Sequence, residues 1–162
     1  MESERGATKF CEVIAYRPFL PMFDTWVEVR DGDPYGRDLF SRHYSKYHYK
    51  DGRKPKLFVG PGEKLVLMTV CGRALFVWRK FISSEKGVSC SIFRNESGRK
   101  SSELIIRAVA IAHERWPGER LFTYVNPRKI KSVNPGYCFK MAGFRFCGVT
   151  KKNKLHILEY TG

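Results

Sequence analysis

The stretch "SIFRNESGRKSSEL", residues 91–104, joins a strand-like segment to a helix-like segment through a short basic turn. Its first residues favour a β-strand, and the glycine and two cations of residues 98–100 then interrupt that pattern. Ser101 and Ser102 follow, and serine is a residue type preferred at helix N-caps. A helix N-terminus beside a glycine and two cations is suited to binding a pyrophosphate, although an ordinary capped helix produces the same pattern.

The segment after this turn predicts a helix over residues 101–116. Its apolar residues recur at helical spacing on one face, namely Leu104, Ile105, Ala108, Ile111 and Ala112. The sequence "PGE" at 117–119 ends the helix, and "RLFTYV" at 120–125 predicts the next strand. We expect the helix to connect two neighbouring strands in parallel, as such crossovers do.

The residues before the basic turn predict a series of β-strands. The candidate strands are residues 10–16, 25–29, 56–60, 64–72, 73–81 and 87–95. Glycine-containing breaks separate the later ones and fit hairpin turns, so we expect an antiparallel meander. Toward the C-terminus, "NPGYCFKMAGF" at 134–144 predicts a short helix closed by Gly143, and residues 144–150 and 154–160 predict a final hairpin.

A short helix is expected to begin at Pro34, because Asp33 before it favours a helix start with proline at the first position. It leads into "FSRHYSKYHY", residues 40–49, which combines two histidines, three tyrosines, an arginine and a lysine. This composition fits a solvated aromatic loop, a nucleic-acid contact surface or part of a catalytic site. The residues expected to share one face of the helix are Leu39, Phe40, His43 and Tyr44.

The order of these elements predicts a single α/β domain of 162 residues built on a mixed sheet. No apolar run approaches the roughly 18 residues that span a bilayer, and the polar N-terminus does not resemble a secretory signal. We therefore expect a cytoplasmic protein that does not insert into membranes. The five cysteines form no CxxC pair and are expected to be reduced thiols.

The charge of the chain is its most distinctive global property. The sequence has 30 Lys and Arg against 16 Asp and Glu, a formal net charge of +14. Such a surface attracts polyanions through counterion release, which makes nucleic acid the first partner to consider. The alternative is a basic protein that has no specific polyanionic partner.

The basic turn, the following helix and strand, and "FKMAGF" at 139–144 together resemble the GCN5-related N-acetyltransferase (GNAT) superfamily. The resemblance covers about residues 57–160 and implies a single-domain GNAT-like fold, with a mixed, mostly antiparallel central sheet of splayed strands flanked by helices. It also implies acetyl-CoA or a related acyl-CoA as cofactor, with residues 1–56 on the substrate side of the domain. The turn has one glycine where the family usually has two. Phe139 stands where a tyrosine often acts as general acid, and a phenyl ring has no proton to donate.

Within this superfamily the chain resembles the Mom DNA-modification family of bacteriophage Mu and related phages. The resemblance rests on "RHYSK" (42–46), "SCSIFRNE" (89–96), "SSELI" (101–105), "ERLFTYVNP" (119–127) and "NPGYCFK" (134–140). It implies a transferase that adds an acetamido-type (carbamoylmethyl) group to the exocyclic amine of adenine in double-stranded DNA, protecting phage DNA from restriction. Iron is a further candidate cofactor, and the oligomeric state stays open, with a homodimer as one alternative. The competing interpretations are an acyl-CoA-dependent N-acetyltransferase for a small amine or protein lysine, and a DNA-binding module without activity.

The resemblance and the chemistry of the side chains nominate the site residues. The candidate catalytic residues are His43, Tyr44, Tyr124, Asn126 and Tyr137. His43 has the chemistry of a general base or metal ligand, or is a histidine satisfied by its neighbours. Asn126 reads a base edge or orients a carbonyl, or else simply ends a strand in a turn. Tyr137 is the preferred substitute for the missing acid.

The remaining candidates are binding residues. The cofactor-binding set is Ser91, Phe93, Gly98, Arg99, Lys100, Ser101 and Ser102, and the DNA-binding set is Arg42, Lys46, Tyr47, Arg128, Lys129 and Lys131. Adenine in a duplex must be flipped out to reach a buried site, and the tyrosines of residues 40–49 are suitable stacking platforms. This interpretation requires that residues 40–49 face the helix start near Ser101 across one cleft.

Overall fold

The computed structural model describes residues 26–162, so the expected strand at 10–16 lies outside the described residues. The elements along the described chain are β1 (Trp26–Val29), α2 (Pro34–Ser41), β2 (Glu63–Thr69), β3 (Ala74–Lys80), β4 (Val88–Asn95), α3 (Ser101–Arg115), β5 (Leu121–Val125), α4 (Tyr137–Met141), β6 (Phe144–Val149) and β7 (His156–Tyr160). The strands form a seven-stranded sheet in the order β1-β2-β3-β4-β5-β7-β6. Every neighbouring pair is antiparallel except β4 and β5, which α3 connects in parallel as the sequence predicts.

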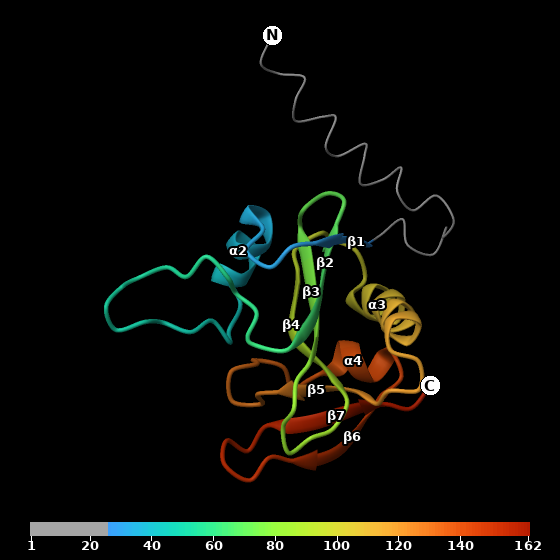
Figure 1. Ribbon diagram of the computed structural model, residues 1–162. Coiled ribbons are helices and arrows are strands. Elements are labelled where there is room, and N and C mark those ends of the chain that lie inside the picture. The colour runs from blue at the N-terminus through green and yellow to red at the C-terminus, as the bar shows by residue number, and fades with distance from the viewer. Residues whose placement is uncertain (1–25) are drawn as a thin grey trace.

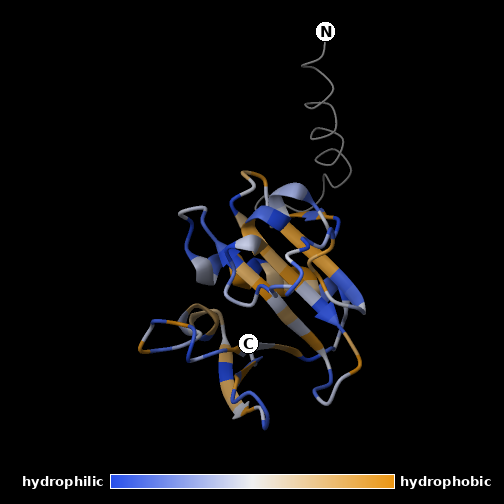
Figure 2. Ribbon diagram, turned by 90° about the vertical axis from the view of Figure 1, so that its left-hand side faces the viewer, coloured by the Kyte–Doolittle hydropathy of each residue, from blue (hydrophilic) through white to orange (hydrophobic). Residues whose placement is uncertain are grey.

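Helices cover both faces of the sheet (Figure 1). On one face, Leu39 of α2 packs with a cluster that includes Val66, Val77 and Ile92. On the other, α3 and α4 bury their apolar residues against the larger core cluster. Figure 2 shows the corresponding concentration of hydrophobic residues along the central strands.

Two tryptophans fasten α3 to the sheet. The indole Nε1 of Trp26 donates to the carbonyl of Leu104 at 2.9 Å, and that of Trp78 donates to the carbonyl of Ala108 at 2.9 Å. Both indoles are buried, at 3% and 0% exposure, so leaving either donor unpaired would carry a full desolvation penalty. These bonds fix the position of α3, and with it the position of the basic turn.

The start of α2 is confirmed, but its predicted face is wrong. Asp33 caps the helix by accepting a hydrogen bond from the backbone N–H of Gly36 at 3.0 Å. The helix ends at Ser41, so His43 and Tyr44 lie beyond it and share no helical face with Leu39. The backbone N–H of His43 bonds the carbonyl three residues earlier, which tightens the last turn and ends the α-helical ladder.

The expected strand at 56–60 is also wrong. Its consecutive apolar residues resemble a strand, but the backbone N–H groups of Phe58 and Val59 both donate to the carboxylate of Asp31, at 2.9 and 3.1 Å. A side chain therefore satisfies the donors that a neighbouring strand would otherwise pair, and the segment stays irregular. This arrangement holds the long connection between α2 and β2 against the sheet.

The N-cap of α3 differs from the expected serine. Lys100 occupies the N-cap position and makes no side-chain capping bond, since helical geometry begins at Ser101. The hydroxyl of Ser101 instead accepts a hydrogen bond from the side-chain amide of Asn95 at 2.9 Å. The first N–H groups of α3 thus have no acceptor within the helix, as at any helix N-terminus, and no side-chain cap replaces it.

Candidate functional site

The strands β4 and β5 separate after only three paired positions. Their parallel pairing runs from Val88 with Leu121 to Cys90 with Thr123, and then ends. The hydroxyl of Thr123 donates to the Cys90 carbonyl at 3.1 Å, which satisfies that carbonyl where the ladder stops. The splayed strands expected of the fold are therefore present.

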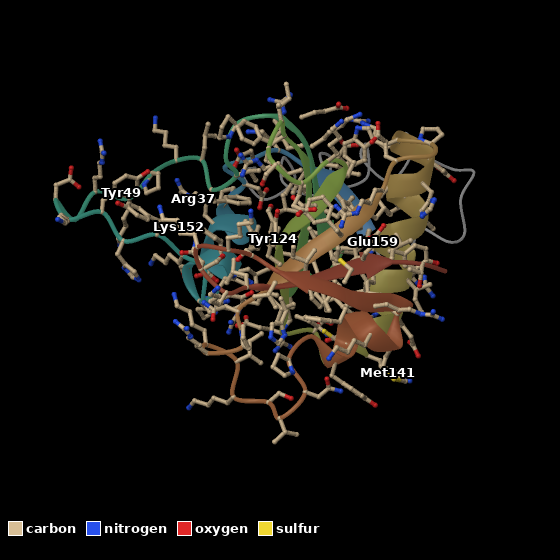
Figure 3. All side chains as sticks on the ribbon, turned by 90° about the horizontal axis from the view of Figure 1, so that it is seen from below. Arg37, Tyr49, Tyr124, Met141, Lys152 and Glu159 are labelled. Carbon is tan, nitrogen blue, oxygen red and sulfur yellow. The ribbon has the colours of Figure 1, made fainter. Side chains whose placement is uncertain are left out.

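A cavity of about 340 Å³ opens where these strands separate. We call it the splay cavity. Its walls come from β4, β5, the loop before α4, α4 itself and the two residues His43 and Tyr44. The lining residues that the sequence nominated are His43, Tyr44, Ser91, Phe93, Tyr124 and Tyr137. Segments that lie far apart in the chain thus meet at one site, and Figure 3 shows Tyr124 near the middle of the molecule.

The other nominated residues do not line the splay cavity. The basic turn at 98–102 lies outside it, and so do Asn126, Arg42 and the basic residues Arg128, Lys129 and Lys131. Lys46 and Tyr47 line a different cavity beside α2. The segment 40–49 is therefore divided between two cavities, and the turn near Ser101 lines neither of them. The expectation of one cleft shared by residues 40–49 and the helix start is thus wrong, and the two regions are linked instead through the ion pair of Arg42 with Glu96.

His43 is buried and is hydrogen-bonded to its neighbours. It is 8% exposed, and its Nδ1 accepts from the backbone N–H of Ser45 at 3.2 Å. Burial and the neighbouring charge of Arg94 lower the pKa of His43 to about 4, while a hydrogen bond to the Phe93 backbone acts in the opposite direction. The ring stacks on Tyr44 at 4.5 Å between centroids. These contacts favour the interpretation of His43 as a satisfied histidine that positions Tyr44 and is neutral at neutral pH.

Two phenols stand in the splay cavity in protonated form. Burial raises the pKa of Tyr44, with the nearby Cys90 thiol as a second cause, while a hydrogen bond from the Asn126 backbone opposes the rise. Burial also raises the pKa of Tyr124. Tyr137 lies at the margin of the cavity, since its side chain is 55% exposed. The site therefore offers phenolic O–H groups as hydrogen-bond donors.

Two thiols also line the splay cavity. Cys90 is buried, and burial strongly raises the pKa of its thiol, which donates to the Ile92 carbonyl at 3.5 Å. Burial also raises the pKa of Cys138. Both thiols are thus protonated at neutral pH, a state that favours packing over nucleophilic attack. The sequence did not nominate Cys90, Thr123 or Ile130 as lining residues, since only the divergence of β4 and β5 exposes them to the cavity.

Phe139 belongs to the core. It is 7% exposed and its ring packs at 5.8 Å from Phe93 and 5.2 Å from Phe144. The position where many GNAT proteins carry an acidic tyrosine is therefore filled by an aromatic side chain that stabilises the junction of α4 and the sheet. The phenyl ring of Phe139 has no proton to donate.

The hydroxyl of Ser91 is the feature of the splay cavity that most directly indicates a ligand. Its Oγ is buried and has no hydrogen-bond partner among the described residues. An unpaired buried hydroxyl costs about 1–3 kcal/mol, so a ligand group that bonds to it gains affinity. A pantetheine arm carries amide groups that can bond to such a hydroxyl. Ser91 lies on the strand that borders this arm in the GNAT superfamily, which the sequence resembles.

The basic turn before α3 is organised by one side chain. The amide of Asn95 donates to the Arg99 carbonyl at 2.7 Å, and its oxygen accepts from the Ser97 hydroxyl at 2.6 Å. Gly98 has a φ of 77°, a conformation that favours glycine, and no atom lies within 4 Å of the space that a Cβ would occupy. The exposed Lys100 follows at the uncapped start of α3. The turn is thus open and positively charged, as pyrophosphate binding requires.

Arg42 joins the end of α2 to this turn. Its guanidinium contacts both carboxylate oxygens of Glu96 at 2.9 and 2.7 Å, and a second pair links Arg94 to Glu96 at 2.8 Å. The hydrogen bonds from Arg42 and then Arg94 lower the pKa of Glu96 to about 2. Arg42 also pairs with Asp38 at 2.8 Å. Arg42, which the sequence nominates as a DNA contact, is therefore paired with carboxylates of the protein itself. These ion pairs hold residues 42–44 beside β4.

The loop after β5 carries the remaining nominated cations. The side-chain oxygen of Asn126 accepts from the backbone N–H of Arg128 at 3.0 Å, a geometry that favours the strand-ending turn. Lys129 reaches back to donate to the Tyr44 carbonyl at 3.3 Å. Arg128, Lys129 and Lys131 are exposed, while Ile130 between them lines the splay cavity. The loop thus places positive charge next to the cavity.

No group of three or more His, Cys, Asp or Glu within residues 26–162 is arranged to hold a metal ion. The suggestion of iron finds no support in these side chains. Across the same residues, no helix has the length and apolar character needed to span a membrane.

Comparison with known proteins supports the fold. The structure is similar to an acyl-CoA N-acyltransferase from Pseudomonas aeruginosa, with a TM-score of 0.55 and 14% sequence identity over 84% of this chain and 98% of that chain. This likeness confirms the GNAT-like fold that the sequence predicts. No protein-family model matches the chain, and no curated protein matches it significantly. The activity and the substrate must therefore be argued from the site.

Proposed function

We propose that the protein is a transferase that modifies the exocyclic amine of adenine in DNA, with a donor bound between the splay cavity and the basic turn. The observation that carries this proposal is the splay cavity itself, which combines an unpaired buried hydroxyl, protonated phenols and an adjoining surface rich in cations. A GNAT-like fold supports the use of an acyl-CoA or a related donor. Protection of phage DNA from restriction is the biological role that this activity would serve.

The donor side of the proposal rests on β4 and the turn after it. Ser91 and Phe93 would hold a pantetheine arm, and the residues that would hold a pyrophosphate are Gly98, Arg99, Lys100, Ser101 and Ser102. When bound, an acyl-CoA would supply a thioester, whose carbonyl carbon bonds to an amine as the CoA thiolate leaves. A carbamoylmethyl group would instead require a related donor with its leaving group on the methylene carbon. The negative charge of Glu103 in the first turn of α3 opposes an anion, so the two cations of the turn must outweigh it.

The acceptor side rests on the aromatic residues of the splay cavity. An adenine in duplex DNA exposes its amine to such a cavity only after it flips out of the stack. Tyr44 and Tyr124 offer rings on which the base can stack, and stacking of this kind is typically worth about 1–3 kcal/mol per base. The cations of residues 128–131 would hold the adjoining phosphates.

Transfer to an amine requires that one proton leaves the acceptor nitrogen and that one reaches the leaving group. We assign the proton donor to Tyr137, which lines the splay cavity and whose exposed side chain can recover a proton from water. Tyr44 and Tyr124 are deeper phenols with raised pKa values and are better suited to orienting the base. Neutral His43 then acts by positioning Tyr44.

A second candidate function is acetyl transfer to a small amine or a protein lysine. The size of the splay cavity favours it, because about 340 Å³ lies within the range of small-molecule sites. The transferred group separates the two functions, since a carbamoylmethyl group forms its new bond at a methylene carbon whereas acetyl transfer forms an amide. A third outcome, DNA binding without turnover, would leave both acceptors unmodified.

The deciding experiment is mass spectrometry of nucleosides from cells that express the protein. We expect a modified deoxyadenosine from the wild type. If Tyr137 donates the proton, the modification rate of Tyr137→Phe is expected to be at least about 100-fold lower. Tyr35→Phe is the matched control, because Tyr35 is exposed on α2 and lines neither cavity. Unmodified DNA together with acetylated amines would replace the first function by the second.

A binding experiment tests the donor site separately. Arg99→Ala and Lys100→Ala are expected to weaken CoA binding measured by calorimetry, and Ser91→Ala is expected to weaken it by removing the unpaired hydroxyl. Lys86→Ala, a change of one exposed lysine between β3 and β4, serves as the charge control. Unchanged affinity in the two turn variants would remove the turn from the site.

A further inference from the structure

A second cavity of about 450 Å³ lies beside α2, and the function proposed above does not use it. It is enclosed by α2 and by the long connection to β2, and we call it the α2 cavity. Its basic and aromatic lining residues are Arg37, Lys46, Arg53, Lys54, Phe40, Tyr47, His48, Tyr49 and Phe58. Figure 3 shows Arg37 and Tyr49 on the same side of the molecule, away from Tyr124 at its centre.

The charge of the α2 cavity is positive. Four lining side chains are arginine or lysine, against one carboxylate, Asp38. Asp38 is itself paired with Arg42 at 2.8 Å, and Arg53 pairs with Asp51 at 3.3 Å, so the excess positive charge of the cavity comes from Arg37, Lys46 and Lys54. An anionic ligand is therefore favoured there.

One aromatic ring of the α2 cavity, that of Tyr47, is largely exposed and available to a ligand. Tyr47 is 68% exposed, although a large aromatic ring gains stability when it is covered. Tyr49 lies next to it, with ring centroids 4.9 Å apart, and the guanidinium of Arg53 lies 4.4 Å from the centre of the Tyr49 ring. Exposed rings beside cations are the combination that binds nucleobases and phosphates in single-stranded nucleic acids.

The two cavities are neighbours along the chain. Tyr44 lines the splay cavity and Lys46 lines the α2 cavity, so only Ser45 separates the two linings. Two residues span at most about 7 Å between Cα atoms. Because His43 is held by Ser45 and Arg42 is held by Glu96, this partition between the cavities has a defined position. A nucleic acid strand that crosses the partition would reach both cavities.

We propose that the α2 cavity binds a nucleotide of a nucleic acid strand, with its base against Tyr47 and Tyr49 and its phosphate on Lys46, Arg53 and Lys54. The role of this site is to hold a nucleotide next to the one that enters the splay cavity. That role rests on the proposed function, whereas nucleotide binding by the α2 cavity does not. A free nucleotide presents the same base and phosphate, and the experiment separates the two sources.

The test is fluorescence anisotropy with a labelled single-stranded oligonucleotide and no added donor. Tyr47→Ala and Tyr49→Ala are each expected to weaken binding about 5- to 150-fold, the range for loss of one stacked base. Tyr47→Phe keeps a ring of similar size and is expected to bind like the wild type. Lys46→Ala is expected to reduce the slope of log affinity against log salt by about one.

The controls separate this site from general attraction to a basic surface. Tyr35→Ala removes an exposed tyrosine of the same helix that lies outside the lining, and is expected to bind like the wild type. Heparin, a polyanion without bases, is expected to bind Tyr47→Ala and the wild type equally. Thermal unfolding checks that each variant is folded. Tyr47→Ala is expected to unfold at the same temperature as the wild type, because the Tyr47 ring is exposed and is not part of the core.

Each outcome has one meaning. Adenosine monophosphate that competes at concentrations near those of the oligonucleotide would identify a free nucleotide as the ligand and overturn the strand proposal. Wild-type oligonucleotide affinity in Tyr47→Ala and Tyr49→Ala would overturn the nucleotide site, as would a loss of acidic-peptide binding, with unchanged oligonucleotide binding, in these two variants. Retained oligonucleotide binding by a protein that modifies no DNA would refute the proposed function and leave this inference standing.

Discussion

The buried histidine predicts a specific loss of stability in mild acid. The pKa of His43 falls from its ordinary value of 6.5 to about 4 in the folded protein, chiefly because burial disfavours the charged ring. The unfolded chain therefore binds a proton more tightly than the folded protein between these two pH values. Stability is fully present above pH 6.5 and decreases as the pH falls, until His43 is protonated in both states near pH 4.

The size of the effect follows from the pKa difference. Each tenfold change in proton affinity corresponds to about 1.4 kcal/mol, so the change from 6.5 to about 4 removes about 3 kcal/mol from the free energy of unfolding. Glu96 acts in a lower window, because its folded pKa of about 2 places its loss of stabilisation below its ordinary value of 4.5. The interval between pH 4.5 and 6.5 therefore separates His43 from Glu96.

Urea unfolding at closely spaced pH values tests this prediction. The wild type is expected to lose about 1.4 kcal/mol per pH unit from His43 within the interval. His43→Gln keeps polar atoms in the pocket but does not titrate there, so its stability is expected to change less steeply. His48→Gln, a change of an exposed histidine, is the control. Equal slopes for His43→Gln and the wild type would refute the reasoning.

Three further substitutions test the packing that forms the site, with urea unfolding as the measurement. Gly136→Ala is expected to cost about 1–3 kcal/mol, because a Cβ would lie 2.5 Å from the Leu158 side chain at a φ of 76°; Gly118→Ala has a φ of 74° and open space, so an equal cost there would exclude the clash as the cause. Trp78→Phe removes the indole bond to α3 and is expected to cost about 1–3 kcal/mol, and wild-type stability would contradict the fastening role. Thr123→Val removes the hydroxyl bond at the end of the β4–β5 ladder; an expected loss of about 1 kcal/mol is contradicted by any gain in stability.

The sequence predicts most of the fold because the signals for its elements are local. The apolar spacing of α3, the Asp33 cap of α2 and the strand patterns of β2 to β7 are properties of each segment alone. The parallel connection of β4 to β5 follows from the order of strand, helix and strand. Residues 56–60 show the limit of such signals. Their sequence resembles a strand, but the carboxylate of Asp31 accepts the backbone hydrogen bonds that a neighbouring strand would otherwise accept.

The candidate site was only partly accessible to sequence reasoning. Residues such as Ser91 and Tyr124 could be nominated because they stand at alternate or terminal positions of strands that a recognisable turn identifies. Cys90 and Thr123 carry no signal of their own, because they become cavity residues only where two strands stop pairing. The ion pair of Arg42 with Glu96 could not be predicted from the sequence either, since the two residues are 54 positions apart.

By itself the sequence determined the elements, their order, the basic turn before α3 and the strong positive charge, since each depends on residue types and on spacing within a segment. Tertiary structure alone decided that α2 stops at Ser41, that His43 is buried and neutral, and that residues 43–49 divide between two cavities. The physical reason is that burial and long-range hydrogen bonds set these properties. Ser45 and Tyr44 contact His43 locally, but Arg94 and the Phe93 backbone, which also act on its pKa, lie on β4 about fifty residues further along the chain.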